Sequence, residues 1–86
     1  MYIKAKKSLG QNFLIDREVL EKIVSIKNIT DKEVLEIGPG SGNLTTYILK
    51  KKPKKVYVIE KDHNLSNLLF EKFDNEINII NSDVLE

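Results

Sequence analysis

The sequence predicts an α/β protein built as one half of a doubly wound parallel sheet. Three short runs rich in β-branched and aromatic residues alternate with segments in which apolar residues recur at helical spacing. The connections are short, and three of the four glycines directly follow the first run. Because strands buried on both faces and joined by helices form parallel sheets with right-handed crossovers, we expect three parallel strands with flanking helices.

The composition excludes several kinds of site. The chain of 86 residues is long enough for one domain at most, and its formal net charge is only +1. It has no cysteine and one histidine, which excludes a disulfide scaffold, a thiolate metal site, a cysteine nucleophile and a histidine-rich metal site. No apolar run approaches the roughly 20 residues of a membrane span. We therefore expect a cytoplasmic protein with no metal and no membrane partner.

The first two elements are a helix and a strand. The carboxylate of Asp16 is suited to cap a helix. The segment EVLEI, residues 33–37, predicts a buried strand because it is short, apolar and followed by glycines. The apolar positions of the helix recur with a period of about 3.6 residues: Val19, Leu20, Ile23, Val24 and Ile26.

Two more helices and two more strands follow. The second helix must end before Pro53, and KVYVIE, residues 55–60, predicts the second strand. INIIN, residues 77–81, predicts the third strand. The apolar residues at helical spacing are Leu44, Tyr47, Ile48 and Leu49 in the second helix and Leu65, Leu68, Leu69 and Phe73 in the third.

The glycines follow the first strand, at the end of the sheet where doubly wound proteins bind ligands. A glycine there permits positive φ and a close approach of the backbone to a ligand. A dinucleotide fingerprint would need a fourth glycine where Asn43 stands. The pattern is instead E-x-G-x-G-x-G, from Glu36 through Gly38 and Gly40 to Gly42, which is similar to the first motif of S-adenosylmethionine-dependent methyltransferases. A simple glycine turn is the alternative.

Two carboxylates follow the other predicted strands. Glu60 ends the second strand, twenty positions after Gly40, where a carboxylate can accept both hydroxyl hydrogens of an adenosine ribose. Asp83 follows the third strand and is suited to accept the amino hydrogens of an adenine. The alternative for Glu60 is a solvated glutamate, and the alternative for Asp83 is a helix cap or a turn. Together with the glycines, the two residues predict an adenosine pocket.

Two segments, KKSLGQNFLID and VLEIGPGSGNLT, closely resemble the ribosomal RNA adenine dimethyltransferase family. The resemblance runs from Lys6 to about Asp83. It implies a Rossmann-like methyltransferase sheet with strand order 3-2-1 and S-adenosylmethionine as the cofactor. It also implies N6-dimethylation of two adjacent adenosines in small-subunit ribosomal RNA, with the immature small ribosomal subunit as the partner.

Site residues are carried over from the resemblance position by position. It implies that Asn12 and Leu14 contact the cofactor from the N-terminal segment, although packing of Phe13 and Leu14 onto the sheet is an alternative. It places the glycine loop beside the methionine part of the cofactor, with Glu60 on the ribose and Asp83 on the adenine. The implied cofactor-binding residues are Asn12, Leu14, Glu36, Gly38, Gly40, Gly42, Glu60 and Asp83.

The family's catalytic motif, which resembles N-L-P-Y or N-I-P-Y, is absent. The only prolines, Pro39 and Pro53, are preceded by Gly38 and Lys52. We therefore expect residues 1–86 to be the N-terminal part of the cofactor-binding domain, inactive alone, without the rest of the catalytic domain and the C-terminal helical domain. In the family's sheet the first strand pairs with a fourth, so we expect EVLEI to be an open edge through which the fragment self-associates, whereas the full-length enzyme is expected to be monomeric.

Three other interpretations remain. Macrolide-resistance methyltransferases of large-subunit ribosomal RNA share a Q-N-F segment and the glycine loop, and a non-enzymatic relative could bind RNA or a transcription complex. Asn43 disfavours a nicotinamide oxidoreductase.

Lysines also cluster in KKKPKK, residues 50–55, for which a solvated loop is the simplest interpretation. Lys4, Lys6 and Lys7 are better placed to meet RNA phosphates.

Overall fold

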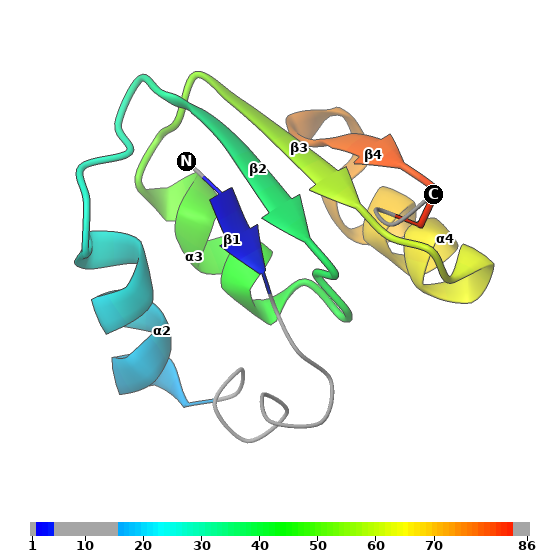
Figure 1. Ribbon diagram of the computed structural model, residues 1–86, viewed down its shortest axis with the longest axis horizontal. Coiled ribbons are helices and arrows are strands. Elements are labelled where there is room, and N and C mark those ends of the chain that lie inside the picture. The colour runs from blue at the N-terminus through cyan, green and yellow to red at the C-terminus, as the bar shows by residue number, and fades with distance from the viewer. Residues whose placement is uncertain (1, 5–15, 84–86) are drawn as a thin grey trace.

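The protein forms a parallel four-stranded sheet, with helices α3 and α4 behind it in the view of Figure 1. The computed structural model describes residues 2–4 and 16–83. The strands are β1 (Tyr2–Lys4), β2 (Glu33–Ile37), β3 (Lys55–Ile59) and β4 (Asn78–Ile80). The helices are α2 (Arg17–Ser25), α3 (Asn43–Lys50) and α4 (His63–Phe73), and a 3-10 turn, η2 (Asp74–Glu76), precedes β4.

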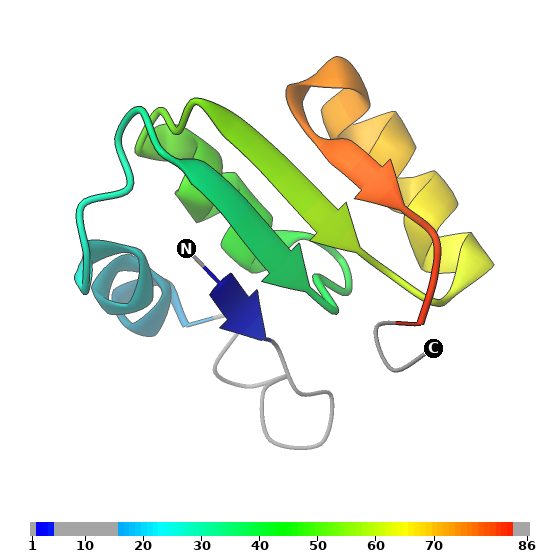
Figure 2. The same ribbon diagram turned by 45° about the horizontal axis from the view of Figure 1, so that its top comes forward.

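The three predicted strands are present in the predicted order. β3 lies between β2 and β4, and all pairs are parallel, with Leu35 opposite Tyr57 and Tyr57 opposite Asn78. The second strand ends one residue earlier than predicted, so Glu60 follows it rather than belonging to it. Figure 2 shows that the arrowheads of β2, β3 and β4 point to the same end of the sheet. The segments that follow these strands therefore meet at one edge.

The prediction of an open edge at β2 is wrong. Residues 2–4 form a further strand, β1, which pairs with β2 in parallel, with Ile3 opposite Glu36. This strand was not predicted, because three residues are too short to show a periodicity. With the edge of β2 covered, the reason for expecting self-association through EVLEI is removed.

The core lies between the sheet and the helices. Val34, Val56 and Val58 are fully buried on the sheet, and each helix adds buried residues to the same cluster. Asp16 caps α2 as predicted, because its Oδ1 accepts hydrogen bonds from the N–H groups of Glu18 and Val19. The helices contribute Leu20 and Val24 from α2, Leu44 and Ile48 from α3, and Leu69 and Phe73 from α4.

Two residues that were expected on apolar helix faces are exposed. Ile26 is 79% exposed and lies just beyond α2, which ends at Ser25. Leu68 is 55% exposed because the buried side of α4 is formed by Ser66, Leu69 and Phe73. Among the described residues, no helix combines the length and apolar character needed to cross a membrane.

Candidate cofactor site

The glycine loop connects β2 to α3 by a turn that requires glycine. Gly38, Gly40 and Gly42 have φ angles of 67°, 60° and 87°, in the left-handed region that L side chains rarely adopt. The N–H of Gly38 donates to the carbonyl of Ile59 at 2.9 Å, and that of Gly42 donates to the carbonyl of Pro39 at 3.0 Å. The positive φ that glycine was expected to permit is present at all three positions.

Gly40 and Gly42 have different surroundings. A Cβ placed on Gly40 would meet no heavy atom of the described residues within 4 Å. A Cβ on Gly42 would lie 2.5 Å from Cε2 of Phe73 and 3.1 Å from Cδ2 of Leu69. Gly42 is therefore required by the packing of α4, whereas none of residues 2–4 and 16–83 fills the space beside Gly40.

The carboxylate of Glu60 lies against the glycine loop. Its Oε1 accepts a hydrogen bond from the N–H of Gly40 at 3.3 Å, and its Oε2 accepts one from the N–H of Asp62 at 3.0 Å. The side chain of Asn81 holds the backbone here by donating to the carbonyl of Glu60 at 2.9 Å. The residue is only 6% exposed. Each carboxylate oxygen retains a further lone pair, so Glu60 is able to accept more hydrogen bonds while it holds the loop.

The segment after β4 joins the same edge. The N–H of Ser82 donates to the carbonyl of Glu60 at 3.1 Å. Asp83 is the next residue in the chain after this contact. Asp83 is partly buried. The structure thus brings together the ends of β2, β3 and β4, as predicted, while the roles of Glu60 on a ribose and Asp83 on an adenine stay predictions.

Glu36 lies beneath the loop and has no exposed surface. Its Oε1 accepts a hydrogen bond from the hydroxyl of Thr45, in the first turn of α3, at 2.5 Å. Its Oε2 is buried and has no hydrogen-bond partner among the described residues. Burial raises the pKa of Glu36 from 4.5 to about 7, and the Thr45 hydrogen bond opposes this rise. Glu36 is thus linked through Thr45 to the first turn of α3, and its role in cofactor binding stays a prediction.

Sequence reasoning missed two residues that fix the site. Thr45 is fully buried against Glu36. Lys72, in the last turn of α4, donates from Nζ to the carbonyl of Ser41 at 3.3 Å. Thr45 lies nine residues after a buried glutamate, a spacing that gives no periodic signal in the sequence. Lys72 contacts the loop from 31 residues away in the chain.

Two predicted site residues, Asn12 and Leu14, lie outside the described residues. No group of three His, Cys, Asp or Glu residues in the described part is arranged to hold a metal ion.

Comparisons with known proteins identify the family. The family model of ribosomal RNA adenine dimethylase matches residues 2–86. The ribosomal RNA small subunit methyltransferase A of Pelagibacter ubique (strain HTCC1062) is 80% identical over the whole chain, which covers 33% of that relative. The protein of the same name from Sulfurihydrogenibium sp. (strain YO3AOP1) is 46% identical over 98% of this chain and 34% of its own length.

A solved structure also matches. The crystal structure of the 23S rRNA methyltransferase ErmE superposes with a TM-score of 0.75 and 34% sequence identity, over 86% of this chain and 31% of that one. The chain thus spans about a third of the length of the proteins that it matches. The match to the family model over nearly every residue shows that the chain belongs to the ribosomal RNA adenine dimethylase family.

Proposed function

We propose that the protein carrying this chain binds S-adenosylmethionine at the edge formed by the glycine loop, Glu60 and Asp83, and methylates adenosines at N6 in small-subunit ribosomal RNA. Family membership and the Rossmann-like fold support the cofactor. The relative with 80% identity, whose name specifies the small subunit, supports the substrate. Dimethylation of two adjacent adenosines is the finer form of this proposal.

The hydrogen bond from Gly40 to Glu60 is the observation that carries the cofactor proposal. It sets a carboxylate that still has acceptor capacity beside a stretch of backbone where a Cβ would meet no atom of the described part of the chain within 4 Å. These features suit a nucleoside, because ribose hydroxyls need an acceptor and the adjoining part of the ligand needs close backbone approach. The residues present therefore fit the cofactor that the family implies.

In this proposal the described residues bind and orient the cofactor, and none of them is assigned the role of a base. When bound, S-adenosylmethionine supplies a methyl group on a positively charged sulfur, open to attack by an amine. Methyl transfer to an amine depends on approach geometry and electrostatic placement. The 86 residues contain no N-x-P-aromatic motif, so we propose that groups outside them hold the target adenine.

A methylation assay tests the proposal. The natural protein, incubated with labelled S-adenosylmethionine and small ribosomal subunits that lack N6-methyl groups, should transfer label to the small-subunit RNA as N6-methylated adenosine. The likeness to ErmE supports a second candidate, a methyltransferase of large-subunit RNA. Label found only in large-subunit RNA would favour that candidate, and label in neither RNA would overturn both. We expect the 86 residues alone to give background transfer.

A further inference from the structure

The segment from the last residue of α3 to the first residue of β3 carries an exposed group of lysines at the end of the sheet opposite the glycine loop. Lys50, Lys52, Lys54 and Lys55 are exposed there, and Lys32 is exposed beside them. The backbone N–H of Lys54 donates to the carbonyl of Lys32 at 2.8 Å, so the two segments are neighbours. We call these five residues the lysine surface.

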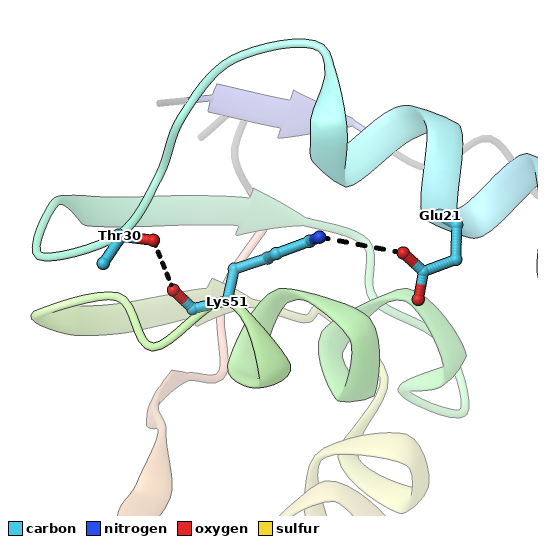
Figure 3. A network of polar contacts seen from close by, with 3 residues as sticks. All are labelled: Glu21, Thr30 and Lys51. Carbon is cyan, nitrogen blue, oxygen red and sulfur yellow. Dashed lines mark hydrogen bonds and ion pairs between the residues drawn. The ribbon is translucent and has the colours of Figure 1, made fainter.

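The backbone that carries the lysine surface is held in place. The hydroxyl of Thr30 donates to the carbonyl of Lys51 at 2.8 Å, and the N–H of Asp31 donates to the carbonyl of Lys52 at 3.0 Å. Lys51 also forms an ion pair with Glu21 of α2, with Nζ and Oε2 3.8 Å apart (Figure 3). Because these contacts already order the loop, binding of a ligand there costs little backbone conformational entropy.

Lysines outnumber acidic residues on this surface. The ion pair with Glu21 is formed by Lys51, which is not one of the five lysines. The Nζ of Lys50 lies 4.4 Å from the centroid of the Tyr47 ring, a contact that leaves its charge in place. Asp31 and Glu33 are the acidic residues of the adjoining segment. Five lysines beside two acids give a locally positive surface.

We infer that the lysine surface binds the phosphate backbone of ribosomal RNA, as a second contact apart from the cofactor site. This inference rests on the proposed function, which supplies RNA as the substrate. Exposed lysines act as point charges that bind phosphates without reading sequence. β3 is five residues long, about 17 Å. One folded RNA is therefore able to reach both ends of the sheet.

Paired variants of the natural protein test the inference. Lys52→Gln with Lys54→Gln removes two charges from the lysine surface, and Arg17→Gln with Lys22→Gln removes two exposed charges from α2 as the control. The probes are small ribosomal subunits that lack N6-methyl groups and their protein-free RNA, titrated at several salt concentrations. S-adenosylmethionine affinity, measured by calorimetry, reports whether each variant is folded.

The lysine variant should bind both probes about tenfold more weakly, and the slope of log affinity against log salt should fall in magnitude by about 2, since each phosphate contact contributes about 1. The control should retain both values, Lys52→Arg with Lys54→Arg should restore binding, and cofactor affinity should not change. Equal losses in the lysine variant and the control would attribute the effect to overall charge and overturn the inference.

Two other outcomes would also overturn it. Unchanged affinity and salt slope in the lysine variant would show that the surface touches no phosphate. Weaker binding to the assembled subunit with unchanged binding to protein-free RNA would assign the surface to a ribosomal protein. Failure of the proposed function is distinguishable, because it would appear in the unmodified protein as absent cofactor binding or absent methyl transfer.

Discussion

Thr45 on α3 donates a hydrogen bond to Glu36 on β2, and neither side chain has any exposed surface. The two residues stand on either side of the glycine loop, so this bond fixes the start of the helix relative to the end of the strand. Because one oxygen of Glu36 has no partner among the described residues, ionisation would leave a buried charge that is only partly compensated.

Glu36 should make the stability depend on pH. Its pKa is about 7 in the folded protein against 4.5 in an unfolded chain, so the folded state binds more protons between these values. The free energy of unfolding should therefore be highest below about pH 4.5 and fall as the pH rises to about 7, by on the order of 3 kcal/mol. In urea unfolding from pH 5 to 8, Glu36→Gln should lose most of this slope. A variant with the same slope as the unmodified protein would assign the titration to another group.

Glu60→Ala should weaken S-adenosylmethionine binding. Loss of a carboxylate that accepts hydrogen bonds costs about 1.5 to 3 kcal/mol, or roughly a 10- to 150-fold rise in Kd. Since Glu60 also binds the N–H groups of Gly40 and Asp62, the Tm without cofactor should fall too. Calorimetry on the natural protein measures the affinity, with the exposed Glu71→Gln as the control. Unchanged affinity in Glu60→Ala would remove the ribose role.

Gly40→Ala and Gly42→Ala should separate ligand space from packing. Both strain a backbone with positive φ, by about 1 to 2 kcal/mol. Only Gly42→Ala also forces a Cβ against Phe73, which should add about 1 to 3 kcal/mol of destabilisation. Urea unfolding should show the larger loss for Gly42→Ala, and Phe73→Leu should reduce the difference in a double-mutant cycle.

Cofactor affinity provides the complementary measurement for Gly40. The larger side chain of Gly40→Val should occupy the open space beside the backbone and abolish detectable binding, in a protein that remains folded. A Gly40→Val structure that held S-adenosylmethionine in the same place as the unmodified protein would contradict the close-approach argument.

The pairing of β1 with β2 should be visible in hydrogen exchange. Ile3→Pro removes a backbone donor from β1 and disfavours a strand at that position. Some amides among residues 34–37 should then exchange faster, whereas those of β3, between β2 and β4, should keep their protection. Ile3→Val, which retains the N–H group, should resemble the unmodified protein. Unaltered exchange in Ile3→Pro would mean that β1 does not protect the edge.

Local signals were sufficient to predict most of the fold. The Asp16 cap, the strand at residues 33–37 and the glycine turn each depend on neighbours close in sequence, and the structure has all three. The meeting of three strand ends was also predictable, because parallel strands align their carboxyl ends. The contact between Gly40 and Glu60 is an instance of that rule.

The misses depend on contacts that a sequence pattern does not encode. The packing reason for Gly42 requires Phe73, 31 residues away, and the support of Glu36 requires the hydroxyl of Thr45 to face inward. Leu68 fits a helical period but stands at the margin of the buried side of α4, where tertiary packing decides its exposure. β1 is specified by its pairing with β2 rather than by its own composition.

The order of strands in the sheet has a consequence for synthesis on the ribosome. Each strand after β1 pairs with the strand that precedes it in the chain, and paired residues are only roughly 20 to 35 positions apart. None of these pairings has to wait for residues translated later, so the sheet is able to grow strand by strand as the chain emerges. The glycine loop and Glu60 would then meet as soon as β3 docks on β2, before β4 has emerged from the ribosome.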